Sequence, residues 1–208
     1  KAFLGQMLVL YLLCTKLSYE QKSINKKDYQ KKIKDLLSLS KSAKNTLNIE
    51  DKIQTLGKAF ANSKGSMFLG RGYSYPIALE GALKLKELAY VHAEGYPAGE
   101  MKHGPLALIE EGMPVVVIAP RDEHYKKTIS NMQEVISRGA KVLLITNKST
   151  DEIYSENIWE QIEVDAISDE LIPFLTTIPL QKLAYYSALD KGYDIDKPRN
   201  LAKSVTVE

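Results

Sequence analysis

Cysteine is nearly absent from this sequence, since Cys14 is the only one among 208 residues. A single thiol excludes an intrachain disulfide and fits a reducing, cytoplasmic environment. The only histidines are His92, His103 and His124, and without a cysteine cluster they do not form a metal-ligand spacing. We therefore expect no disulfide framework, no bound metal and no cofactor.

A large excess of either charge is also absent. The chain has 28 basic and 26 acidic residues, which gives a formal net charge of +2. This balance gives no electrostatic reason to expect nucleic acid or an anionic membrane as a partner. The hydrophobic content of 44% is typical of a globular protein, and 208 residues suffice for one large domain or one and a half small ones.

No hydrophobic run is long enough to predict a membrane span. Residues 2–14 are mostly apolar but number only 13 and include Gln6, whereas a span needs about 20 apolar residues. Leu13 stands where a secretion signal would need a small residue before Cys14. We expect residues 2–17 to form a helix that is buried on more than one side, against a partner that is missing or distant. Because the chain begins at Lys1 rather than methionine, we also expect it to be an internal piece of a longer protein.

The segment that follows, residues 18–63, is rich in lysine and has apolar residues at helical spacing. It predicts two amphipathic connecting helices. The apolar positions are Ile33, Leu36, Leu37, Leu39, Ile53, Leu56 and Phe60.

A different pattern begins at Met67, where short apolar runs alternate with helical segments. The runs are 67–69, 115–119, 142–146 and a shorter one at 162–164, and the helical segments are 75–91, 124–138 and 174–189. Continuous apolar strands separated by helices indicate a parallel sheet covered on both faces. The predicted fold class is therefore a three-layer α/β/α sandwich, with ligand sites expected at the carboxyl ends of the strands.

The sequence GRGYSYP at residues 70–76 joins the first predicted strand to a helix. Its glycines could let backbone amides approach an anion at the positive end of that helix, and Pro76 suits the first helical position. A third glycine and a Gly-Lys-Ser/Thr triplet are both missing, so this is neither a dinucleotide motif nor a P-loop. The residues favour a tight turn first and a phosphate cradle second.

The helix after this loop carries a row of charged residues beside its apolar stripe. Glu80, Lys84 and Glu87 share one face because residues three and four apart on a helix are neighbours. Lys84 could compensate the charge of Glu87 or set its proton affinity in a pocket. The alternative is a solvated row of ion pairs worth ~0.2–0.5 kcal/mol each. The apolar stripe consists of Ala78, Ala82, Leu85 and Ala89.

Residues 93–105, AEGYPAGEMKHGP, combine three glycines and two prolines with charged residues. This composition is typical of a functional loop. His103 precedes a Gly-Pro pair, so a turn presents its ring, which could titrate near neutral pH. The alternative for a lone histidine is a surface residue or a hydrogen-bonding residue of the core.

The tail DKPRNLAKSVTVE at residues 196–208, the two glycines at 70–72, EGALKLKE at 80–87 and GEMKHGP at 99–105 resemble one family. This is the family of isomerising glutamine:fructose-6-phosphate aminotransferases, or glucosamine-6-phosphate synthases. The resemblance implies a remnant helix of a preceding sugar isomerase (SIS) domain at 1–18 and a helical linker at 19–57. It further implies a second SIS domain at 58–192 and a catalytic tail at 193–208.

In that family an N-terminal domain with a cysteine nucleophile releases ammonia from glutamine. A pair of SIS domains then converts fructose 6-phosphate to glucosamine 6-phosphate. The resemblance implies that this sequence holds only the second SIS domain and a remnant of the first. It has no counterpart of the glutaminase domain or of the Ser/Thr-rich loop of the first SIS domain, which binds the substrate phosphate. Cys14 lies within a predicted helix and does not match the glutaminase nucleophile.

The resemblance implies a role for each matching residue. Glu87 matches the carboxylate that moves a proton between C1 and C2 of the sugar. His103 matches the residue that helps to open the sugar ring, in the family from the neighbouring subunit, so a homodimer is implied. Lys84 matches a lysine near the reacting carbons that stabilises enolate charge.

The tail matches the remaining family positions. Lys203 matches the lysine that forms a Schiff base with the open-chain ketose, which requires a lowered pKa, and Arg199 is a plausible source of the field that lowers it. Leu201 and Ala202 could pack over the sugar, with the tail closing as a lid. The alternative is a frayed terminus with solvated lysines.

Three functions are consistent with these residues. The first is the isomerase part of such a synthase, which we expect to be inactive as an isolated chain because the phosphate-binding domain is missing. The second is a sugar-phosphate-binding SIS module without turnover, and the third is a dimerisation scaffold. Glu87, His103 and Lys203 favour the enzyme, because a binding module needs no base, ring-opening group and imine-forming amine together.

Overall fold

The computed structural model describes residues 2–147, 158–199 and 201. The α-helices are α1 (Ala2–Glu20), α2 (Lys26–Leu47), α3 (Glu50–Ala61), α4 (Ser74–Ala89), α5 (Tyr125–Ile136) and α6 (Ile172–Asp190). The strands are β1 (Ser66–Gly70), β2 (Ala93–Pro97), β3 (Pro114–Ile118), β4 (Lys141–Asn147) and β5 (Glu160–Val164), and two 3₁₀-helices follow β2, η1 (Ala98–His103) and η2 (Pro105–Leu108).

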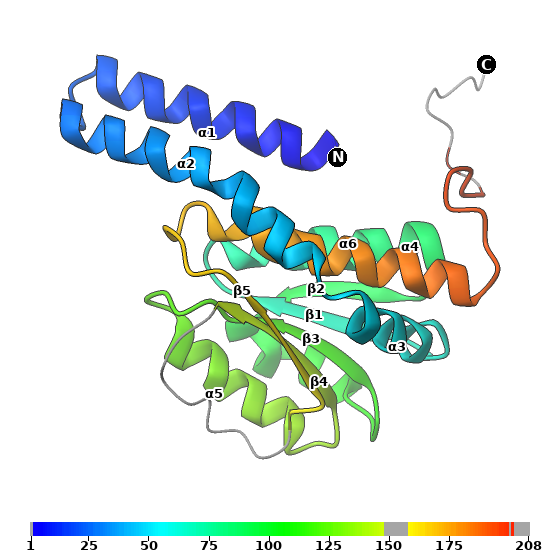
Figure 1. Cartoon of the computed structure of the whole chain (residues 1–208). Helices are drawn as coiled ribbons and strands as arrows, with labels where there is room; N and C mark the ends of the chain where they lie inside the picture. Colours follow the sequence, from blue (N-terminus) through cyan, green and yellow to red (C-terminus); the bar gives the residue numbers. More distant parts are fainter. Residues whose placement is uncertain (1, 148–157, 200, 202–208) are drawn as a thin grey trace, which may run out of the picture.

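All five strands pair in parallel, in the order β2-β1-β3-β4-β5. Helices α3, α4 and α6 lie on one face of the sheet and α5 on the other (Figure 1). Because successive side chains of a strand point to opposite faces, β1 supplies Phe68 to one face and Met67 and Leu69 to the other. The predicted three-layer α/β/α fold is confirmed.

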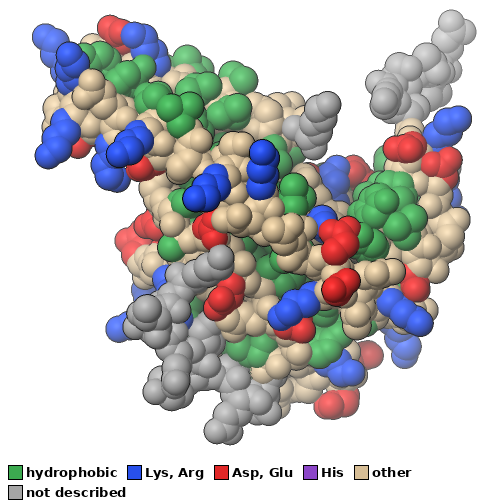
Figure 2. All heavy atoms as spheres, in the orientation of Figure 1, with side chains coloured by type: hydrophobic (Ala, Val, Ile, Leu, Met, Phe, Trp, Pro, Cys, Tyr) green, Lys and Arg blue, Asp and Glu red, His purple; other side chains and the backbone are tan. Residues whose placement is uncertain are grey.

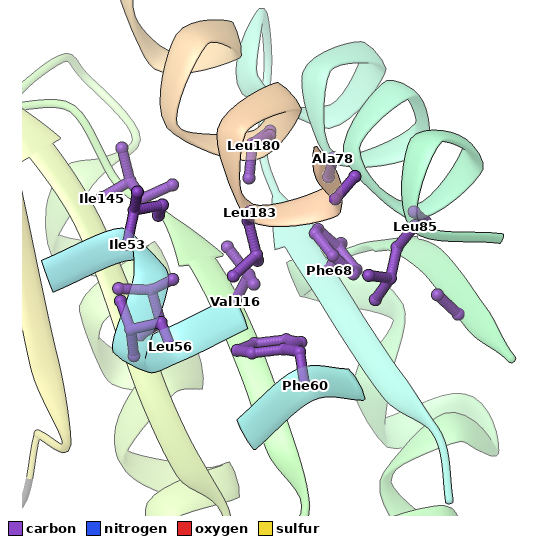
Figure 3. Packing of buried hydrophobic residues seen from close by; sticks show 14 of the residues in the cluster. Ile53, Leu56, Phe60, Phe68, Ala78, Leu85, Val116, Ile145, Leu180 and Leu183 are labelled. Atoms are coloured by element: carbon purple, nitrogen blue, oxygen red, sulfur yellow. The ribbon is translucent and has the colours of Figure 1, made fainter. Parts of the chain in front are cut away.

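Each face of the sheet has its own hydrophobic core. The larger core joins α3, α4 and α6 to the sheet, and Figure 3 shows Phe60 of α3 and Leu183 of α6 approaching Phe68 and Val116. The smaller core packs Met132 and Val135 of α5 with η1 against the opposite face. Both faces are therefore covered, which explains why the central strands contain continuous apolar runs rather than an alternation of apolar and polar residues.

Strand β2 was not predicted, because residues 93–105 have the composition of a loop. The structure corrects this: the segment begins with an edge strand, which is hydrogen-bonded only to β1 in the described sheet. An edge position tolerates Pro97, which cannot donate to a second neighbour. Gly95 is needed there because an added Cβ would lie 2.9 Å from the backbone of Leu79 in α4. Close packing against a helix therefore explains a residue that looks like a loop signal.

Helix α1 forms as expected, but it is not buried. Thr15 is its only buried residue in the described chain, while Val9, Leu10 and Leu13 are each more than half exposed. The helix packs beside α2, and Phe3 and Met7 pack against the larger core, but much of its apolar surface stays exposed, so hydrophobic side chains gather on this end of the molecule (Figures 1 and 2). By length and composition alone α1 could cross a membrane, a test that core helices of soluble proteins also pass.

Helices α2 and α3 confirm the two predicted connecting helices, and both are attached to the sheet domain. Lys32 of α2 pairs with Glu170 at 2.6 Å, and the Asn45 amide donates to Asp165 at 2.7 Å. In α3, Ile53 and Leu56 belong to the larger core although they fall within the predicted linker at 19–57. The boundaries of the four predicted segments remain predictions.

Candidate functional site

Helix α4 carries the predicted row of charged residues and is held rigidly. All four residues of its predicted packing stripe are buried. A methyl group on Gly81 would lie 2.8 Å from Cδ1 of Leu180 in α6 and 2.9 Å from Cδ1 of Phe68 in β1. The absence of a side chain at Gly81 lets α4 approach both neighbours closely, so the charged row has a fixed support. The helix begins at Ser74, two residues before the predicted start at Pro76.

The row itself forms as the spacing predicts. The Nζ of Lys84 donates to Oε2 of Glu87 at 2.5 Å and lies 3.9 Å from Oε1 of Glu80. The side chains of Lys84 and Glu87 are 29% and 27% exposed, so a ligand can reach both. One ammonium group therefore stands between two carboxylates on a partly covered surface, an arrangement suited to proton transfer beside a fixed cation.

Glu80 is the member of this row to which the sequence assigned no role. Its side chain is only 8% exposed, and its Oε1 has no hydrogen-bond partner. Burial raises the pKa of Glu80, the charge of Lys84 opposes this rise, and the charge of Glu87 adds to it. The four-residue spacing between Glu80 and Lys84 could have indicated from the sequence that Glu80 belongs to the row. The burial of its carboxylate could not be predicted, because it depends on how α4 packs.

Arg199 reaches the end of the same helix. Its backbone N–H donates to the Tyr90 hydroxyl at 2.7 Å, and its guanidinium carbon lies 4.1 Å from the centre of the Tyr90 ring. Tyr90 follows α4 directly, three residues after Glu87. The start of the predicted catalytic tail is thereby brought to the helix end that carries Glu87.

His103 lies elsewhere. It ends η1, its side chain is 75% exposed, and its Nε2 is 4.0 Å from Oε2 of Glu100. Helix α4 packs in the larger core on one face of the sheet, whereas η1 packs in the smaller core on the opposite face. Lys102, next to His103, pairs with Glu134 of α5 at 3.1 Å. Glu87 and His103 therefore belong to elements on opposite faces of the sheet within one chain.

The group formed by Lys84, Glu87 and Arg199 lies at the C-terminal end of α4, not at the carboxyl ends of the strands. The rule for open α/β sheets places ligands at the strand ends, but here the charged row is on the helix that crosses back over the sheet.

The loop at residues 70–76 is a tight turn. A Cβ on Gly70 would lie 2.3 Å from the carbonyl oxygen of Ser74, and the amides of Ser74 and Tyr75 already donate to the carbonyls of Arg71 and Gly72. Asp122 and Asp169 line the adjacent cavity, and burial together with neighbouring acidic groups, Asp122 first, raises the pKa of Asp169. These carboxylates would repel an anion, so the turn is favoured over the phosphate cradle.

Two predicted site residues, Ala202 and Lys203, lie outside the described residues. Leu201 is described and is half exposed. Within the ranges that the structure describes, no group of three His, Cys, Asp or Glu side chains is arranged to hold a metal ion.

Comparisons with known proteins bear on the family and the fold. Residues 59–190 match the family described as "SIS domain". The chain is 50% identical over 208 residues to the glutamine–fructose-6-phosphate aminotransferase (isomerizing) of Bacteroides thetaiotaomicron, and 46% identical over 209 residues to that of Bradyrhizobium diazoefficiens. In both cases the match covers 100% of this chain and 34% of the relative, so the chain spans about a third of the length of these proteins.

A solved structure is also similar over nearly the whole chain. It is the C-terminal domain of glucosamine-fructose-6-phosphate aminotransferase from Francisella tularensis, with a TM-score of 0.90 and 40% sequence identity. The similarity covers 94% of this chain and 55% of that chain.

Proposed function

The chain belongs to the SIS domain family, and on that premise we propose that it is the isomerase part of a glutamine:fructose-6-phosphate aminotransferase. The proposed reaction converts fructose 6-phosphate to glucosamine 6-phosphate with ammonia derived from glutamine. The observation that carries the proposal is the hydrogen-bonded Lys84–Glu87 pair on α4, with Arg199 held beside the same helix end. The similarity to two isomerizing aminotransferases along the whole chain supports it. We further propose a cytoplasmic location.

In this proposal Glu87 is the base. Its carboxylate takes a proton from one of the two carbons C1 and C2 and returns it to the other, so it ends each cycle unchanged. Lys84 keeps its proton and stabilises the negative charge that develops on the substrate oxygen, because a fixed cation stabilises the enolate more than the neutral sugar. The 2.5 Å contact between Lys84 and Glu87 supports both roles, since it holds base and cation together.

The amine of Lys203 would attack the ketose carbonyl, and loss of water would give a Schiff base. A cation nearby favours the neutral, nucleophilic amine, and Arg199 is the proposed cation. His103 would assist ring opening in the site of a second subunit. The location of η1, which His103 ends, on the opposite face of the sheet from α4 supports this assignment, and with it a homodimer.

Substitution of Glu87 tests the proton-transfer role. In the longer protein that contains both SIS domains, Glu87→Gln should lower the rate of fructose 6-phosphate isomerisation by about 10²–10⁴-fold, the usual contribution of a general base. Glu110→Gln, at an exposed carboxylate, is the matched control and should retain the native rate. A Glu87→Gln variant with native activity would contradict the proposal.

Mixed dimers test the location of His103. Glu87→Gln and His103→Ala subunits are mixed in equal amounts after each is shown to be inactive. If His103 acts across the subunit boundary, each heterodimer regains one of its two sites, and the mixture recovers about a quarter of native activity. If both residues serve the same chain, mixing restores nothing.

Trapping separates turnover from simple binding. Borohydride reduction in the presence of fructose 6-phosphate should attach the sugar covalently to Lys203 in the protein with both SIS domains. Binding without an adduct at that position would favour a sugar-phosphate-binding module.

A further inference from the structure

The end of α4 has an aromatic residue where a small one is usual. Tyr90 adopts the left-handed conformation, with φ 53° and ψ 32°, and its N–H donates to the Lys86 carbonyl. Helices commonly end in this conformation with glycine or asparagine, because a Cβ is crowded there. In the described part of the chain, Lys22 is the only other non-glycine residue with positive φ. An unfavourable backbone conformation that persists at a bulky residue points to a functional constraint.

The Tyr90 side chain makes contacts that a glycine could not. Its ring centre lies 4.8 Å from that of Tyr193, and the guanidinium of Arg199 lies over it at 4.1 Å. Its hydroxyl accepts the backbone N–H of Arg199 at 2.7 Å. The ring and the hydroxyl thus bind the same residue in two ways, through a cation–π contact and a hydrogen bond.

The chain between α6 and Arg199 is folded so as to reach Tyr90. Helix α6 ends in a Schellman motif: Gly192 has φ 70°, its N–H donates to Leu189, and the N–H of Tyr193 donates to Ala188. Lys191 donates to the carbonyl of Ala89, which joins the ends of α6 and α4.

A second turn follows at once. The carboxylate of Asp194 accepts the backbone N–H groups of both Asp196 and Lys197, at 2.9 and 3.1 Å. An Asp side chain that bonds to the backbone just after it forms a local turn. Pro198 then fixes the backbone before Arg199. The path to Tyr90 is therefore built from defined turns.

We propose that Tyr90 is a positioning residue that latches the C-terminal segment onto the end of α4. The latch consists of Tyr90 and Arg199, supported by Tyr193. Because Glu87 is on the last turn of α4, the latch fixes the distance between this carboxylate and the point from which the chain continues after residue 199. The latch stands on its own contacts, and its consequence for catalysis rests on the proposed function above.

The latch can be tested on this chain by NMR, with two variants that remove different parts. Tyr90→Phe keeps the ring and removes the hydroxyl acceptor, so amide hydrogen exchange at Arg199 should be about fivefold faster, the usual net effect of one hydrogen bond. Tyr90→Gly removes the ring from a backbone that suits glycine, so the upfield ring-current shift of the Arg199 side-chain protons should disappear. Tyr185→Phe, at an exposed tyrosine of α6, is the control and should change neither. Unchanged exchange and shifts in both Tyr90 variants would overturn the latch.

The positioning role needs a kinetic readout in the protein with both SIS domains. Tyr90→Gly should lower kcat for fructose 6-phosphate isomerisation at least tenfold and slow borohydride trapping of the sugar, with an unchanged Tm. Tyr90→Phe should show a smaller loss. If Tyr90→Gly loses the ring-current shift of the Arg199 side-chain protons but keeps the native kcat, the positioning role is wrong. An inactive native protein would refute the proposed function instead, while the NMR result would still decide the latch.

Discussion

Replacement of Gly81 by alanine tests whether close packing supports the charged row of α4. Alanine favours a helix interior over glycine by ~0.8–1 kcal/mol, so an exposed site would be stabilised. At Gly81 the new methyl would lie 2.8 Å from Leu180 and 2.9 Å from Phe68, which are almost completely buried. Overpacking of this kind costs ~1–3 kcal/mol. We expect a net loss of about 1 kcal/mol, the difference between these terms.

Two further glycines make the test specific. Gly5 in α1 has no atom within 4 Å of the added Cβ, so Gly5→Ala should not destabilise the protein. Gly57 in α3 should tolerate alanine least, because its Cβ would lie 2.6 Å from Cβ of Tyr186 and 3.0 Å from the backbone nitrogen of Ser187, which no rotamer change can move. The assay is urea unfolding followed by circular dichroism, with equal m-values required for comparison. A Gly81→Ala variant as stable as the native chain would refute the packing argument.

Two predictions concern pH. Burial raises the pKa of Glu80 above 4.5. The contribution of Glu80 to stability is therefore complete below pH 4.5 and is lost as the pH rises through the pKa of the folded state. Glu80→Gln should remove this decline in Tm between pH 4 and 7. Burial alone would raise the pKa of Glu160, but the hydrogen bonds from Lys52 and from the backbone N–H of Gln161, with the charge of Lys52, lower it. The contribution of Glu160 to stability is therefore present above pH 4.5 and is lost as the pH falls through the pKa of the folded state. Lys52→Met should lower the free energy of unfolding, measured in urea, by about 0–1 kcal/mol at pH 7, as for an exposed pair, and by less at pH 3. An unaltered pH profile in either variant would contradict the corresponding assignment.

The strands that could be predicted from the sequence are the ones covered on both faces. Strand β3 and residues 142–145 of β4 are apolar without interruption, because each of these side chains meets one of the two cores. Strand β2 has no such signal, since it lies at the edge and only Ala93 is buried. Its Gly95 and Pro97 are explained by the approach of α4 and by the missing second neighbour, and neither condition can be read from local sequence.

The charged row could be predicted because it depends only on helical spacing. The contact between Tyr90 and Arg199 could not, since the two residues are 109 positions apart and meet only after α6 has packed beside α4. The burial of Glu80 and the left-handed conformation of Tyr90 likewise depend on tertiary structure. Helical spacing therefore predicted the contact between Lys84 and Glu87, but not the tertiary contacts around it.

The separation of Glu87 from His103 follows from the topology itself. In this parallel β-α-β unit the crossover helix α4 covers one face of the sheet, whereas η1, which follows β2, packs in the core of the opposite face. Side-chain rotation cannot bring them together, because both backbones belong to the rigid sheet domain. In the proposed homodimer, a reaction that uses both residues on one sugar draws them from two chains. If this proposal is right, dilution below the dimer dissociation constant should abolish ring opening, while the Lys84–Glu87 pair within each chain stays intact.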